Sequence, residues 1–141
     1  MDSCTPIKTP VEARIPWEQI DNAELVNQTH YRQLVGSLRY LTATRPDISF
    51  GFGLVSRFME APSQAHLQAA KRILRYVKGT QADGIFYASS NNSELLGYAD
   101  TDWAGDHLDR KSTSGFLFLM GFGIISWSSK KQQSCSLYCR S

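Results

Sequence analysis

Residues 98–131 read YADTDWAGDHLDRKSTSGFLFLMGFGIISWSSKK, and this stretch sets the kind of fold that the chain can build. Its second half is a long run of aromatic and aliphatic residues, which is typical of β-strands. Two glycines divide the run, so we expect a hairpin between strands over residues 115–120 and 124–128. An apolar run over residues 95–100 predicts a further strand in front of the hairpin.

The chain upstream of these strands has the periodicity of helices. Thr29 is expected to cap a first helix, which stops at Arg45 because a residue before proline is disfavoured in the helical region. The clearest helix contains HLQAAKRILRYVK, with Ser63 as its N-cap and Gly79 as its C′ residue. Its apolar stripe has helical spacing and consists of Leu67, Ala70, Ile73, Leu74 and Val77.

Other segments are less regular. Residues 47–59 fit helical spacing, but the alternation over residues 48–54 also fits a strand. Residues 84–87 predict a short strand, and residues 89–92 predict a turn. The chain therefore divides into a helical half and a β half near residues 88–93, and its predicted fold class is α+β.

Composition is that of an ordinary globular protein. A length of 141 residues suits one domain or two parts of domains, and a net charge of +2 does not by itself indicate nucleic-acid binding. No apolar signal segment follows Met1, and the longest apolar stretch is too short to span a bilayer. We therefore expect an intracellular protein that makes no membrane contact, and no feature indicates a small-molecule substrate.

The aspartates after residue 99 are the candidate metal ligands. Asp100 ends an apolar strand, so its carboxylate is expected at a sheet edge, within reach of a divalent ion. Mg²⁺ takes hard oxygen ligands, often one or two carboxylates together with substrate phosphates. Asp102 is the weaker candidate, and we expect it to point to the opposite face if the strand continues. The alternative is that these aspartates only solubilise a loop.

Four basic residues on the clearest helix are the candidate nucleic-acid contacts: Lys71, Arg72, Arg75 and Lys78. Three of them have i, i+4 and i+7 spacing, so their side chains share one helix face. Ammonium and guanidinium groups in such a row can neutralise backbone phosphates without reading bases. The alternative is an ordinary solvated helix face.

Several long motifs together resemble one family. YRQLVGSLRYLTATRPDISF, VSRFMEAPSQAHLQAAKRILRYVKGT, GYADTDWAGD, RKSTSGF and ISWSSKKQ are similar to the Pol polyprotein of copia-type LTR retrotransposons, over about residues 4–133. In that family this region runs from the end of the reverse transcriptase into RNase H. Three prolines and the lack of periodicity predict an irregular lead-in over residues 1–28. The resemblance implies a thumb- or connection-like helical segment over residues 29–87. It also implies an incomplete antiparallel RNase H-like sheet over residues 93–133.

The resemblance also assigns roles to the candidate residues. Asp100 matches the family's metal-binding aspartate, a catalytic residue that we expect to be vestigial here, and Asp102 is a second candidate ligand. Mg²⁺ is the cofactor of the parent enzyme, and we do not expect this chain to bind it stably. The helix with the four basic residues matches a segment before RNase H, which implies contact with a template–primer duplex or an RNA–DNA hybrid.

The chain departs from the family near its C-terminal end. The family's RNase H glutamate lies soon after K-K-Q, whereas this chain reads QSCSLYCRS there. Tyr-Cys-Arg-Ser can be encoded by bases that read Thr-Ala-Glu-Ala one position later, so residues 134–141 are interpreted as an aberrant, frameshifted tail. We therefore expect a fragment without catalytic activity of its own. The alternatives are a duplex-binding module and a nuclease subunit that another chain completes.

Overall fold

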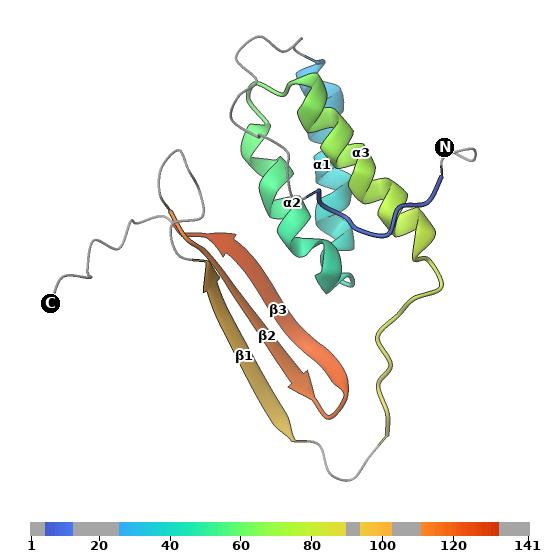
Figure 1. The fold of residues 1–141 in the computed structure, drawn as a ribbon, viewed down its shortest axis with the longest axis vertical. Coiled ribbons are helices and arrows are strands. Elements are labelled where there is room, and N and C mark those ends of the chain that lie inside the picture. The colour runs from blue at the N-terminus through green and yellow to red at the C-terminus, as the bar shows by residue number, and fades with distance from the viewer. Residues whose placement is uncertain (1–4, 13–25, 90–93, 103–110, 133–141) are drawn as a thin grey trace, which may run out of the picture. The chain divides into compact units, whose positions relative to one another are not determined.

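The structure of the chain, a computed structural model, describes residues 5–12, 26–89, 94–102 and 111–132. It contains two compact units, Met1–Asp83 and Gly84–Ser141 (Figure 1). The first is helical and the second is an antiparallel sheet, so the expected α+β class is confirmed. The tail over residues 134–141, which was interpreted as frameshifted, lies outside the described residues.

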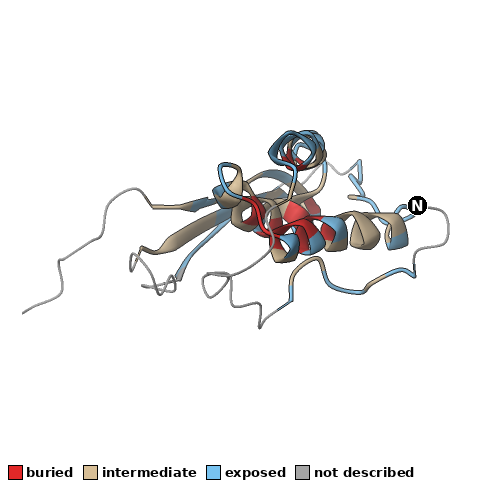
Figure 2. Ribbon diagram, turned by 90° about the horizontal axis from the view of Figure 1, so that it is seen from above, coloured by how far each residue is buried: buried red, intermediate tan, exposed pale blue. Residues whose placement is uncertain are grey.

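In its described residues, the helical unit contains three α-helices and two short 3₁₀ turns. In chain order these are α1 (Gln28–Leu41), η1 (Pro46–Ile48), α2 (Ser49–Val55), η2 (Ser56–Phe58) and α3 (Gln64–Gly79). One core joins the three helices, and its fully buried large side chains are Tyr31, Val35, Leu38, Ile48, Val55 and Ile73. Figure 2 shows the buried residues concentrated in these helices. In the part of the chain that the structure describes, no helix is long and apolar enough to cross a membrane.

The bounds of α1 differ from the prediction at both ends. Asn27, not Thr29, is the N-cap, because its side-chain oxygen accepts the backbone N–H of His30 at 3.0 Å. The helix ends at Leu41, before Arg45, and Pro46 instead opens η1, where a missing N–H costs nothing.

Residues 47–58 lie in η1, α2 and η2, which settles the choice between helix and strand; Met59 is a bend. Ile48, Gly51 and Val55 are buried at spacings of three and four residues, as expected for one face of a helix. Tyr31 of α1 donates its hydroxyl to the carbonyl oxygen of Val55 at 2.7 Å, and burial raises the pKa of this phenol. This bond ties the start of α1 to the end of α2.

The N-cap of α3 is Ser63, as predicted. Ser63 accepts the backbone N–H of His66, and the His66 ring accepts the backbone N–H of Ser63 at 3.0 Å, so the two residues form a capping box. The prediction for Gly79 is wrong. Gly79 is the last helical residue and not a left-handed C′ residue, and Thr80 is the C-cap.

The described part of the second unit forms a three-stranded antiparallel sheet in the order β1-β2-β3. Its strands are β1 (Leu95–Asp102), β2 (Thr113–Met120) and β3 (Gly123–Lys131). The hairpin between β2 and β3 turns at Gly121, whose φ of 60° lies in the left-handed region that glycine adopts without strain. The predicted strands and hairpin are therefore confirmed, with longer strands than expected.

The expected strand over residues 84–87 is wrong. Within the described ranges these residues have no strand partner, and Tyr87 meets β3 through its side chain. Its hydroxyl donates to the carbonyl oxygen of Ile124 at 2.6 Å, and its ring lies against Gly123, where a Cβ would overlap with it. Residues 84–87 therefore contact the edge strand β3 through the side chain of Tyr87 and not through backbone pairing.

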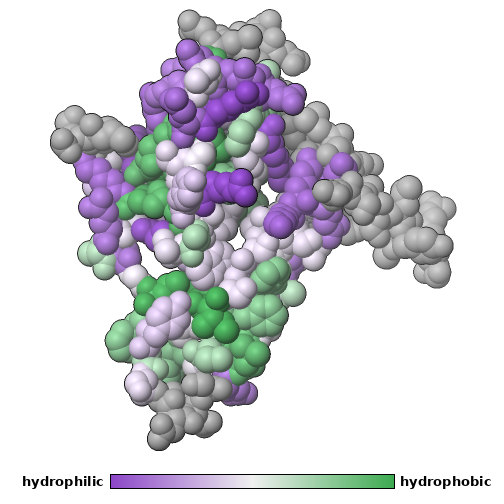
Figure 3. Space-filling view, turned by 180° about the vertical axis from the view of Figure 1, so that it is seen from behind, coloured by the Kyte–Doolittle hydropathy of each residue, from purple (hydrophilic) through white to green (hydrophobic). Residues whose placement is uncertain are grey.

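The sheet leaves much of its apolar surface exposed. Phe116 and Phe118 lie on the same face of β2 with their ring centroids 5.7 Å apart, and both are about two-fifths exposed. Apolar side chains gather at the hairpin end of the sheet, as the green surface at the bottom of Figure 3 shows.

Candidate nucleic-acid interface

One side of helix α3 packs in the core, and its basic residues lie on the sides that are not buried. Its buried side chains are His66, Leu67, Ala69, Ala70 and Ile73. Lys71 is exposed, and Arg72, Arg75 and Lys78 are half-buried. The four predicted contacts are thus on the accessible sides of one helix. Two of them, Arg72 and Arg75, also make hydrogen bonds within the chain that the sequence did not indicate.

Arg72 is held by the N-terminal segment over residues 5–12, which we call the strap. The Arg72 Nε donates to the carbonyl oxygen of Thr9 at 3.2 Å, and one terminal nitrogen donates to the Thr9 hydroxyl at 3.0 Å. The other terminal nitrogen is paired with the carboxylate of Glu12 at 3.5 Å. All three guanidinium nitrogens of Arg72 therefore contact the strap.

Arg75 holds the beginning of the same segment. Its Nε donates to the carbonyl oxygen of Thr5 at 3.1 Å. Next to this contact, Pro6 lies so close to Gly79 that a Cβ on Gly79 would come within 2.8 Å of the Pro6 Cβ. The strap thus lies against the C-terminal half of α3, between Arg72 and Gly79, where the dark blue segment passes the helix in Figure 1. Residues 5–12, the described part of the expected lead-in, have neither helix nor strand structure and pack on α3.

The second candidate site is the carboxylate pair on β1. The strand continues through Asp102, and Asp100 pairs in register with Gly115 and Asp102 with Thr113. Positions two apart share one face of a regular strand, so continuation of the strand gives no reason to expect opposite faces. The Asp102 side chain itself lies outside what the structure describes. Asp100 is exposed.

This pair does not by itself fit a two-ion magnesium site. Two ions need several carboxylates from different elements, whereas Asp100 and Asp102 come from a single strand. Among the described residues, no three His, Cys, Asp or Glu side chains come together as metal ligands.

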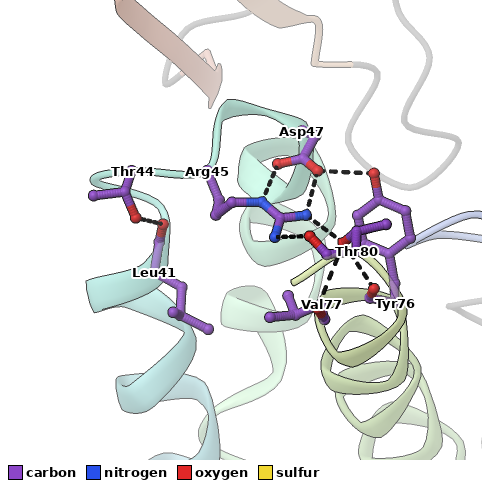
Figure 4. A network of polar contacts seen from close by, with 7 residues as sticks. All are labelled: Leu41, Thr44, Arg45, Asp47, Tyr76, Val77 and Thr80. Carbon is purple, nitrogen blue, oxygen red and sulfur yellow. Dashed lines mark hydrogen bonds and ion pairs between the residues drawn. The ribbon is translucent and has the colours of Figure 1, made fainter. Parts of the chain in front are cut away.

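Sequence reasoning missed a polar network at the C-terminal end of α3. Arg45 donates to both carboxylate oxygens of Asp47, at 3.0 and 2.7 Å, and to the hydroxyl and carbonyl oxygens of Thr80, at 2.6 and 3.3 Å (Figure 4). Tyr76 donates its hydroxyl to Asp47 at 2.8 Å. The network links the turn before α2 to the last turn of α3 and so fixes where the basic helix ends.

The electrostatics of this network follow from its hydrogen bonds. The bond from Arg45 lowers the pKa of Asp47, and the same bond raises the pKa of Arg45. The pKa of Tyr76 is raised because its hydroxyl donates to the Asp47 carboxylate. The spacing of Arg45 and Asp47 is a local signal that could have suggested the ion pair, but nothing local indicates Tyr76 or Thr80.

Comparison with known proteins gives the same family as the motifs. The chain is 46% identical over 133 residues to the "Retrovirus-related Pol polyprotein from transposon RE1" of Arabidopsis thaliana, and 42% identical over 133 residues to that from transposon RE2. Each match covers 94% of this chain and 9% of the relative. The chain is also 44% identical over 108 residues to the "Secreted RxLR effector protein 161" of Plasmopara viticola, a match that covers 76% of each protein. No family model matches the chain, and no solved structure matches it significantly.

Proposed function

The chain belongs to the family of retrovirus-related Pol polyproteins from copia-type transposons, and on this basis we propose that it binds the sugar–phosphate backbone of an RNA–DNA duplex. The chain spans 9% of the length of the Pol polyproteins RE1 and RE2. We assign this part to the end of the reverse transcriptase and the first strands of RNase H, on the motifs given above.

One observation carries the proposal: α3 presents Lys71, Arg72, Arg75 and Lys78 on its accessible sides while its apolar side packs in the core. The core holds the helix in place, with Lys71 exposed and the other three cations partly accessible. Phosphate neutralisation needs charges in a row and no base-specific geometry, and it gives affinity that falls steeply with salt.

The lysines provide the direct test because the strap contacts described above are made by the arginines. The double variant Lys71→Gln, Lys78→Gln should bind an RNA–DNA duplex more weakly. The slope of log affinity against log salt should fall by ~2, because each neutralised phosphate contributes ~0.9 to it. The matched control, Arg39→Gln with Lys130→Gln, removes two exposed positive charges from α1 and β3. Equal effects of the two double variants would show that only net charge matters and would reject α3 as the interface.

For the sheet, we propose that β1 is the RNase H strand that carries the metal-binding aspartate, and that this chain alone does not cleave a hybrid. The exposed Asp100 near the end of β1 supports the first part, and the need for carboxylates from several elements supports the second. The purified chain should leave the RNA of a hybrid intact in Mg²⁺, and Asp100→Asn should change nothing. Mg²⁺-dependent cleavage that Asp100→Asn abolishes would establish a nuclease instead.

A further inference from the structure

Arg72 and Arg75 of α3 contact the strap, and they are also among the residues proposed to contact the nucleic-acid backbone. A guanidinium presents its N–H groups as a planar fork that fits a carboxylate or a phosphate. In this structure the N–H groups of Arg72 already donate to the Glu12 carboxylate and to two oxygens of Thr9. Arg75 likewise donates its Nε–H to Thr5 of the strap.

We propose that the strap and a nucleic-acid backbone are alternative ligands of Arg72 and Arg75, so that the strap leaves α3 before both arginines neutralise phosphates. This inference rests on the proposed function and adds its regulation. With the strap in place, α3 offers a duplex only part of its positive charge. Once the strap is released, the same helix offers two further cations.

The strap is held by contacts that a polyanion can replace. The Glu12 side chain is 60% exposed and the Arg72 side chain 24%, and ion pairs with such exposure are weak and screened by salt. The described strap has neither helix nor strand structure, so no backbone ladder holds it. A row of phosphates can therefore compete with a single carboxylate and a few neutral oxygens for the two guanidinium groups.

The surface under the strap nevertheless fits the strap closely at two glycines. Gly79 lacks the Cβ that would collide with Pro6, and Gly51 lacks one that would come within 2.8 Å of a Val11 methyl group. Val11 and Pro10 line a small apolar pocket together with Gly51, Val55, Ala69, Arg72 and Ile73. Close packing at two glycines, one on α2 and one on α3, argues that the strap position is specific, and it offers a way to disturb the strap without touching the arginines.

The test uses the full chain with the double variant Glu12→Gln, Gly79→Ala. The first change removes the carboxylate from Arg72, and the second places a methyl group against Pro6. Alanine also favours a helix more than glycine does, so α3 itself is retained. The matched control is Glu60→Gln, Gly36→Ala: Glu60 is exposed, and a Cβ on Gly36 meets nothing within 4 Å. The control makes the same changes of charge and helix propensity away from the strap.

Binding of a short RNA–DNA duplex is measured by fluorescence anisotropy over a series of salt concentrations. Relative to its control, the strap variant should bind about tenfold more tightly at low salt, with a salt slope steeper by ~2, because two further phosphates are neutralised. Trypsin cleavage after Lys8 of the strap should be faster in the strap variant, and adding the duplex should speed the same cleavage in the unaltered chain.

The outcomes separate the two proposals. If the unaltered chain binds through its lysines but the strap variant matches its control in affinity, slope and cleavage after Lys8, the strap does not compete and only this inference fails. If neither the unaltered chain nor the strap variant binds a duplex, both the inference and the proposed function fail. Binding by the strap variant alone would support both.

Discussion

Replacing Asp47 with asparagine tests whether the network at the end of α3 depends on charge. The Asp47 carboxylate accepts two bonds from Arg45 and one from Tyr76, at 3.0, 2.7 and 2.8 Å. Hydrogen bonds to a buried charged group are worth ~1.5–3 kcal/mol each. The side chain of Asp47 is 36% exposed, so water screens these bonds and a total loss of about 1.5 kcal/mol is expected.

The assay is thermal unfolding of the helical unit, followed by circular dichroism at a helix-sensitive wavelength. A loss of about 1.5 kcal/mol corresponds to a fall of ~6–12 °C in Tm for a unit of this size. Asp83→Asn is the control, because Asp83 is exposed and the change removes the same charge. The control should melt within about 2 °C of the unaltered chain.

The pH dependence gives the sharper result. The folded pKa of Asp47 lies below its ordinary value of 3.8, so its stabilising contribution is fully present above pH 3.8 and is lost as the pH falls through the folded pKa. The difference in Tm between the unaltered chain and Asp47→Asn should therefore be constant from pH ~7 to ~5 and shrink below pH ~4. A difference that persists unchanged into strong acid would refute the charge-based reasoning.

Two further substitutions test the packing of each unit. Tyr31→Phe removes the hydroxyl that donates to the buried carbonyl oxygen of Val55, and urea denaturation should show a loss of ~1–2 kcal/mol, whereas no loss would mean that water or another donor replaces it. Gly123→Ala places a Cβ against the ring of Tyr87 and should displace it, breaking its bond to the β3 backbone. The NMR ring signals of Tyr87, assigned by their loss in Tyr87→Ala, should then move toward those of an exposed tyrosine, and an unmoved ring would contradict the packing described.

Many of the elements could be read from the sequence because their signals are local. Ser63 caps α3 through His66, three residues away, and the hairpin follows from Gly121 and the β-prone runs beside it. Local signals failed where two candidates competed within a few residues. Asn27 and Thr29 can both cap a helix, and the stronger N-cap residue is used.

Residue types at helical or strand spacing were enough to predict the α+β class, the basic row on α3 and the aspartates on β1. The contacts that these residues make were visible only in the tertiary structure. Arg72 meets Thr9 across 63 positions and Arg45 meets Thr80 across 35, and no periodicity encodes such pairs. Gly79 shows the same limit: its position resembles a helix cap, but the absent Cβ makes room for Pro6, a residue far away in the chain that only folding brings to α3.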